Sequence, residues 1–164
     1  MDTTIAKMTE RMIAFSDGNH HDIDHFLRVW AYARTIGISE GLDPQTQLVL
    51  EAAALVHDIA CPLCREKYGN TNGRHQEREG EPMAREFLSG SGLSDAQIDR
   101  VAFLVGRHHT CTGVDGADHQ ILIEADYIAN ALENGYEKRQ IEAFSRHLCK
   151  TAAGKRLLRA LFAV

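Results

Sequence analysis

Residues 52–60 read Ala-Ala-Ala-Leu-Val-His-Asp-Ile-Ala, an apolar stretch that is interrupted only by the adjacent His57 and Asp58. Burying an imidazole and a carboxylate among apolar residues is costly unless a partner satisfies them. A divalent cation would be such a partner. Adjacent residues on a helix point about 100° apart, so one ion can contact both side chains only if it sits between their directions. Further ligands must then come from other helices.

Two other polar residues in apolar surroundings meet this requirement. His25 lies in an amphipathic stretch, and Asp126 lies in Ile-Leu-Ile-Glu-Ala-Asp-Tyr-Ile-Ala-Asn-Ala-Leu, residues 121–132. Two imidazoles and two carboxylates form a mixed nitrogen and oxygen site that suits Fe, Mn, Zn, Co or Ni, and also Mg. Several coordination positions would stay open for water and substrate, which is typical of catalytic sites. Taken alone, His57-Asp58 would be better explained by a histidine at a helix C-terminus followed by an exposed aspartate, and it is His25 and Asp126 that favour a metal site.

Helical periodicity dominates the chain, and no convincing alternating strand appears. A helix stop at Gly41, an N-cap at Asp43 before Pro44, and a capping-box pattern of Ser94 with Gln97 mark three boundaries. We expect an all-α, irregular bundle of about seven helices. The predicted helices cover approximately residues 3–16, 22–40, 44–59, 75–89, 94–105, a stretch from 119 that carries Asp126, 136–150 and 152–162. Residues 61–74 and 111–118 are expected to be loops, because both hold glycines together with Pro, Asn or Asp.

The composition limits what the protein can be. Its 164 residues, 44% of them hydrophobic, suit one compact domain over residues 1–164. The net charge is −5, and 23 acidic and 18 basic residues are mixed along the chain, so no nucleic-acid polymer is expected as a partner. From the sequence we expect no apolar run long enough to cross a bilayer, and the charged N-terminus lacks a signal-peptide core, so we expect no membrane binding and a cytoplasmic protein. Cys61 and Cys64 are interpreted as loop thiols, because no second cysteine pair or βαβ context supports a zinc or redox motif.

The motifs around these residues resemble those of the HD-domain superfamily of metal-dependent phosphohydrolases. They are His25-Phe26-Leu27-Arg28-Val29, then Ala-Leu-Val-His57-Asp58, then Glu-Ala-Asp126, and they cover roughly residues 20–130. The resemblance implies an HD-domain-like, all-α fold in which His25, His57, Asp58 and Asp126 bind one metal ion. The sequence departs from nucleotidase-like members, which carry a Glu-Asp pair soon after the HD dipeptide. Their acid and base assignment is therefore not carried over.

Additional histidines leave the number of metal ions open at one or two. In some HD-domain proteins, further histidines between the HD dipeptide and the last aspartate extend the site. His75, His108 and His109 occupy such positions here, and we name them as candidates for a second metal. His21 lies one helical turn before His25 and could reach the same cavity.

The leading functional prediction is a metal-dependent phosphohydrolase, a phosphatase or phosphodiesterase, that acts on a nucleotide or another small phosphorylated metabolite. Arg28 lies one turn after His25, where it would bind phosphate or form an ordinary ion pair. His75 or His108 would protonate the leaving oxygen, since the pKa of histidine is near neutral. A solvated His75 and a neutral core His108 are the alternatives to these roles.

Two other classes of function stay open. Some HD-like proteins hold two iron ions and use oxygen, and the number of histidines here is compatible with a di-iron oxygenase. A non-catalytic sensor that binds a nucleotide in the metal cavity is the second alternative. The apolar residues at positions 157–162 belong either to the core or to an interface in a homo-oligomer.

Overall fold

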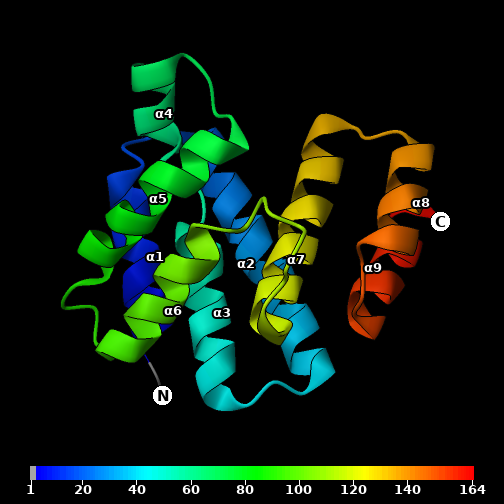
Figure 1. Ribbon diagram of the computed structural model, residues 1–164, viewed down its shortest axis with the longest axis horizontal. Helices are drawn as coiled ribbons and strands as arrows, with labels where there is room; N and C mark the ends of the chain where they lie inside the picture. Colours follow the sequence, from blue (N-terminus) through cyan, green and yellow to red (C-terminus); the bar gives the residue numbers. More distant parts are fainter. Residues whose placement is uncertain (1–2) are drawn as a thin grey trace.

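The computed structural model describes residues 3–164, and within this range the chain forms nine α-helices and no β-strand. The helices are α1 (Thr4–Phe15), α2 (His20–Glu40), α3 (Pro44–Val56), α4 (Cys61–Tyr68), α5 (Gly73–Leu88), α6 (Asp95–Val105), α7 (Gly116–Asn134), α8 (Lys138–His147) and α9 (Ala152–Phe162). The predicted all-α class is confirmed: the eight predicted stretches correspond to eight of these helices, and α4 is the additional one. In Figure 1, α2 and α3 lie between α7–α9 on one side and α1 and α4–α6 on the other.

Three helix ends follow directly from the sequence signals. The Asp43 side chain accepts hydrogen bonds from backbone N–H groups in the first turn of α3, and Pro44 is the first residue of that helix. Gly41 ends α2 with a φ of 76°, a conformation that glycine adopts without steric cost. Ser94 and Gln97 form the predicted capping box at the start of α6.

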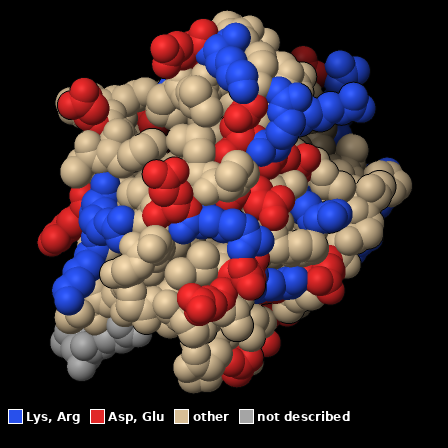
Figure 2. Space-filling view, turned by 60° about the vertical axis from the view of Figure 1, so that its left-hand side comes forward, with Lys and Arg blue, Asp and Glu red and all other residues tan. Residues whose placement is uncertain are grey.

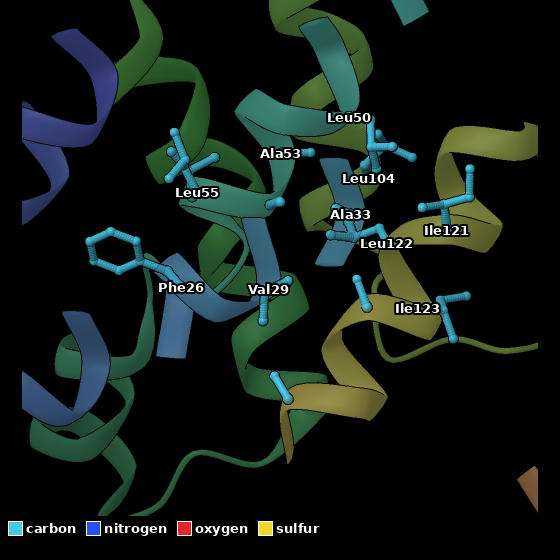
Figure 3. Close-up of a cluster of buried hydrophobic side chains, with 14 of the residues drawn as sticks. Phe26, Val29, Ala33, Leu50, Ala53, Leu55, Leu104, Ile121, Leu122 and Ile123 are labelled. Carbon is cyan, nitrogen blue, oxygen red and sulfur yellow. The ribbon is translucent and has the colours of Figure 1, made fainter. Parts of the chain in front are cut away.

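The core is formed by the apolar faces of α2, α3, α6 and α7 (Figure 3). Helix α3 is enclosed on several sides, because it packs against α1, α2, α6 and α7. Three consecutive alanines, residues 52–54, are completely buried in it, and their small side chains allow close approach of the neighbouring helices. The C-terminal end of α3, where His57 and Asp58 follow, is thereby held in the interior.

The prediction of a loop over residues 61–74 is wrong for most of this range. Helix α4 covers Cys61–Tyr68, and only the four residues before Gly73 separate it from α5. Pro62 is compatible with a helix because it stands in the first turn, where its missing N–H has no helical partner to lose. Cys61 and Cys64, which were interpreted as loop thiols, are free cysteines buried in α4.

The two C-terminal helices fold back onto the bundle. Helix α9 packs against α2, α7 and α8, and Leu158 is completely buried there, whereas Leu161 remains 40% exposed. The buried carboxylate of Glu124 in α7 holds the connection to α9. It accepts hydrogen bonds from the backbone N–H groups of Lys150 at 2.7 Å and Thr151 at 3.0 Å.

One segment passes the length and hydropathy test for a membrane span, although no such run was expected from the sequence. Residues Pro44–Tyr68, which comprise α3, the following turn and α4, are long and apolar enough to cross a membrane by length and hydropathy alone. In this fold, 72% of the apolar window is buried inside the protein, so its hydropathy is that of a central core segment.

On the face shown in Figure 2, acidic and basic side chains are interspersed, as expected from the sequence.

Candidate metal centre

The four predicted ligands come together from three helices. His25 belongs to α2, His57 and Asp58 directly follow α3, and Asp126 lies in the middle of α7. Because α2 packs against both α3 and α7, and α3 packs against α7, these positions meet at one place. The constellation that was predicted from spacing and apolar context is present in the fold.

The ligand atoms lie within a few ångströms of one another. Nε2 of His25 is 3.1 Å from Nε2 of His57 and 3.2 Å from Oδ1 of Asp126. The same nitrogen is 3.4 Å from Oδ2 of Asp58. Nε2 of His57 is 3.4 Å from Oδ1 of Asp126 and 3.6 Å from Oδ1 of Asp58. His25, His57 and Asp126 are buried, and only the Asp58 side chain, 26% exposed, has substantial access to solvent.

His108 adds a third imidazole to this cluster. It follows the end of α6, and its Nε2 lies 3.4 Å from Oδ1 of Asp58. Its ring centroid is 5.1 Å from that of His57. Potential ligand atoms form three overlapping groups among the described residues: His25, His57 and Asp58; His57, His108 and Asp126; and Asp58, His108 and His109.

Hydrogen bonds fix the orientation of all three buried rings. Nδ1 of His57 is 2.8 Å from the carbonyl oxygen of Ala54, and Nδ1 of His108 is 2.8 Å from that of Val105. A carbonyl oxygen only accepts, so each Nδ1 must carry the proton, and in the neutral ring Nε2 keeps a free lone pair. His25 makes the corresponding bond from Nδ1 to Oε2 of Glu133, at 2.9 Å. Nε2 of each ring is thus left facing the cluster, in the manner of metal-binding histidines.

The unsatisfied polar atoms at this point test whether a metal fits. Oδ1 of Asp58 and Nε2 of His108 are buried and have no hydrogen-bond partner. Nε2 of His25 and Nε2 of His57 are 3.1 Å apart. At most one proton fits between them, and without it two hydrogen-bond acceptors face each other. Leaving a buried polar group unsatisfied costs about 1–3 kcal/mol. A divalent cation held by His25, His57, Asp58 and Asp126 would satisfy the two facing nitrogens, and His108 offers a further nitrogen beside Asp58, so the residues fit a metal ion.

The charges in the cluster also favour metal binding. Burial raises the pKa of Asp126, but hydrogen bonds with His25 and His57 outweigh it and hold this pKa well below its usual range. The pKa of Asp58 is lowered in the same way, because the charge of His57 and the interaction with His108 outweigh burial. Burial would lower the pKa of His25, yet the hydrogen bond with Asp126 and the nearby carboxylates raise it to about 9. Both aspartates are therefore ionised at neutral pH, as metal ligands must be.

Two residues of α7 support the ligands. Nδ2 of Asn130 donates a hydrogen bond to Oδ1 of Asp126 at 2.9 Å, which holds the carboxylate in place. Glu133 accepts the bond from His25 and lies 3.6 Å from Nη1 of Arg28. Glu133 was not predicted from the sequence. A signal was present, because Glu133 lies seven residues after Asp126 and therefore on the same helical face.

The other predicted histidines are placed differently. His109 lies beside the cluster, with its ring centroid 4.0 Å from that of His108 and its Nε2 3.2 Å from Oε1 of Gln76. His75 is not part of any ligand group, since its ring stacks on Tyr68 at a centroid distance of 3.9 Å. The side chain of His21 is 76% exposed and is likewise not part of them.

Arg28 and the basic residues of α4 have partners within the protein. The Arg28 side chain is 49% exposed, so its contact with Glu133 leaves donors free for an anion. Arg65 pairs with Asp22 at 2.6 Å and ties α4 to α2, and Lys67 pairs with Glu79 at 3.0 Å. Arg65 and Lys67 therefore have structural roles in addition to any contact with a ligand.

A cavity of about 370 Å³ opens onto the cluster. Three of the residues in its wall are His108, His109 and Asp126, and the others are Thr71, Gln76, Cys111, Ile123, Tyr127, Asn130, Tyr136, Phe144 and Leu148. A larger cavity of about 720 Å³ lies between α1, α2 and α3 and holds none of the cluster residues. The buried carboxylate in its wall, Glu51, is already satisfied by hydrogen bonds from Trp30 and Arg34. We therefore regard the smaller cavity, whose wall includes cluster residues, as the candidate site.

Comparisons with known proteins agree with this geometry. The family model of the HD domain matches residues 22–131, more than half of the chain, and the chain therefore belongs to the HD-domain family. A comparison with curated proteins gave no match. Among solved structures, the fold is similar to a crystal structure described as a predicted HD superfamily hydrolase from an uncultured Thermotogales bacterium. The two share 21% sequence identity with a TM-score of 0.71, over 96% of this chain and 84% of that chain.

Proposed function

We propose that this protein is a metal-dependent phosphohydrolase, a phosphatase or phosphodiesterase, acting on a nucleotide or another small phosphorylated metabolite. One observation carries the proposal. Three buried imidazoles, each fixed through Nδ1, turn Nε2 toward the overlapping ligand groups that they form with Asp58 and Asp126, and a cavity lined by His108 and Asp126 opens there. Mixed nitrogen and oxygen ligands suit Fe, Mn, Zn, Co or Ni, with Mg also compatible.

A divalent ion held here would lower the pKa of a bound water and polarise a phosphoryl oxygen. The side chains of the protein would do the rest. His25, His57, Asp58 and Asp126 would hold the ion, His108 would extend the site beside Asp58, and Asn130 keeps the Asp126 carboxylate oriented. This placement makes His108 better suited to be a ligand than the proton donor that the sequence suggested, since its Nδ1 is bonded to the carbonyl oxygen of Val105 and its Nε2 faces Asp58.

Arg28 is the cation best placed to assist phosphate binding. Its guanidinium lies next to Glu133, which in turn contacts His25, and half of its side chain is exposed. A planar fork of donors beside the cluster would neutralise part of the phosphate charge. An Arg28→Lys variant keeps the charge but loses the fork, so a rise in KM for the phosphoester is the expected result.

The test is turnover of phosphoesters by protein loaded with Mn²⁺, compared with Asp58→Asn and His57→Gln variants whose helical content is checked by circular dichroism. Turnover that is lost in folded variants supports the proposal. Activity that persists in both variants would contradict it. Tight binding of a nucleotide without turnover would instead support the sensor.

A second candidate, a di-iron oxygenase, is favoured by the additional ligand group of Asp58, His108 and His109, which could hold a second ion beside the first. Two iron ions per chain and an absorption spectrum that changes on reduction would support it. A single ion of any metal, or two ions without redox change, would argue against it.

A further inference from the structure

The wall of the active-site cavity away from the metal cluster is aromatic. The ring of Tyr127 stacks on Phe144, with centroids 3.6 Å apart and planes only 2° apart. Tyr136 contacts Tyr127 edge-on, with ring centroids 5.5 Å apart. Leu148, 37% exposed, extends the apolar surface. We call Tyr127, Tyr136, Phe144 and Leu148 the aromatic wall.

The cavity contains no basic side chain in its wall other than histidine. No Lys or Arg stands among the described residues that line it. A neighbouring cavity of about 280 Å³ shares Cys111, Ile123 and Leu148 with it and includes Lys150, but Nζ of Lys150 donates to the carbonyl oxygen of His147 at 2.6 Å. A second or third phosphate group placed against the aromatic wall would lose its hydration without gaining a cation, which is costly.

Most of the aromatic wall comes from outside the part of the chain that matches the HD-domain family. The match ends at residue 131, whereas Tyr136, Phe144 and Leu148 lie beyond it, in α8 and its flanking turns. The metal cluster lies entirely within the match. The wall is thus an addition by the C-terminal segment to the general site, and it is suited to determine which substrate this protein accepts.

From this arrangement we propose that the substrate is a phosphomonoester of a small aromatic or apolar alcohol that carries no further negative charge. The inference rests on the proposed phosphohydrolase function. The phosphoryl group would face the metal cluster while the alcohol part lies on the aromatic wall. In the reaction, the P–O bond to the alcohol breaks, a new P–O bond to water forms, and the proton that water loses is balanced by the one that the alcohol oxygen gains. A volume of about 370 Å³ is near the lower end for small-molecule sites, which fits such a compound.

The experiment compares phenyl phosphate, methyl phosphate and ATP as substrates of the full-length, Mn²⁺-loaded protein and its Tyr136→Ala variant. Tyr32→Ala serves as the control, since Tyr32 is a half-buried tyrosine on α2 that does not line the cavity. The parent should prefer phenyl phosphate to ATP in kcat/KM. In Tyr136→Ala, kcat/KM for phenyl phosphate should fall about tenfold relative to methyl phosphate, which corresponds to loss of about 1.4 kcal/mol of apolar contact.

A fall of equal size for phenyl and methyl phosphate, or a preference of the parent for ATP, would overturn the inference. Absence of turnover for every ester would contradict the phosphohydrolase function, and a binding measurement then tests the wall separately. With phenylphosphonate and methylphosphonate as probes, tighter binding of the phenyl compound that disappears in Tyr136→Ala supports the wall. Equal binding of the two probes by the parent overturns it.

Discussion

Replacing Glu133 by glutamine tests how strongly the residues around the cluster control metal binding. The Glu133 carboxylate accepts a hydrogen bond from Nδ1 of His25 at 2.9 Å, and its side chain is only 12% exposed. A negative acceptor at this position holds the ring in one orientation and makes Nε2 a better donor to a metal. Glutamine keeps the shape and can still offer an oxygen, but the charge is lost.

The expected size of the effect follows from comparable histidine partners. Loss of such a partner weakens metal binding by about 10- to 100-fold, or about 1.4–2.7 kcal/mol. Because glutamine keeps an acceptor, we expect Glu133→Gln to weaken metal binding about tenfold, whereas Glu133→Leu should weaken it by close to 100-fold. The assay is competition for Zn²⁺ or Mn²⁺ against a chelator of known affinity, at fixed pH.

Glu137→Gln is the matched control, because Glu137 lies only four residues further along, is 66% exposed and pairs with Arg139 at 2.8 Å. Its metal affinity should equal that of the parent. An unchanged affinity in both Glu133 variants, or an equal loss in Glu137→Gln, would refute the supporting role of Glu133.

Three further predictions concern the fold. Leu122→Ala should lower the free energy of unfolding by about 2–5 kcal/mol in urea titrations, since Leu122 is completely buried and leaves a cavity; a loss below 1 kcal/mol would contradict this packing. Ser94→Ala should cost about 1 kcal/mol by removing the cap of α6, and Ser94→Gly should cost less, so the reverse order would count against the capping box. Hydrogen bonds from Tyr68 and Lys67 lower the pKa of Glu79 to about 2, so its stabilising contribution is present above its ordinary pKa of 4.5 and is lost as the pH falls from 4.5 towards 2. Glu79→Gln should therefore have less loss of stability over that range than the parent, and identical pH profiles would contradict the contact.

The four candidate metal ligands could be found from the sequence because their chemistry conflicts with their surroundings. His57-Asp58 and Asp126 stand in apolar stretches where uncompensated polar groups are costly, and the structure brings them together with His25. Helix ends with strong caps were found for the same local reason. Such signals depend only on residues that are close in the sequence, so they can be recognised without knowing the tertiary fold.

The missed features depend on tertiary contacts. Pro, Gly and Asn in residues 61–74 favoured a loop, but burial of Cys61 and Cys64 against the bundle stabilises α4. His75 was a candidate because it lies between the HD dipeptide and Asp126, yet in the first turn of α5 its ring stacks on Tyr68. The aromatic wall was not predicted, because Tyr127 and Phe144 are 17 residues apart in the sequence and come into contact only where α8 lies beside α7 in the fold.

Metal content per chain is the measurement that tests the centre most directly. Protein purified without added metal would be analysed by elemental analysis beside a His57→Ala, Asp58→Ala double variant and a His21→Ala control. One or two transition-metal ions in the parent and in the control, with almost none in the double variant, is the predicted result. Negligible metal in all three proteins, even after incubation with Mn²⁺, Fe²⁺ or Zn²⁺, would contradict the metal centre and leave the HD-domain family membership as a matter of fold alone.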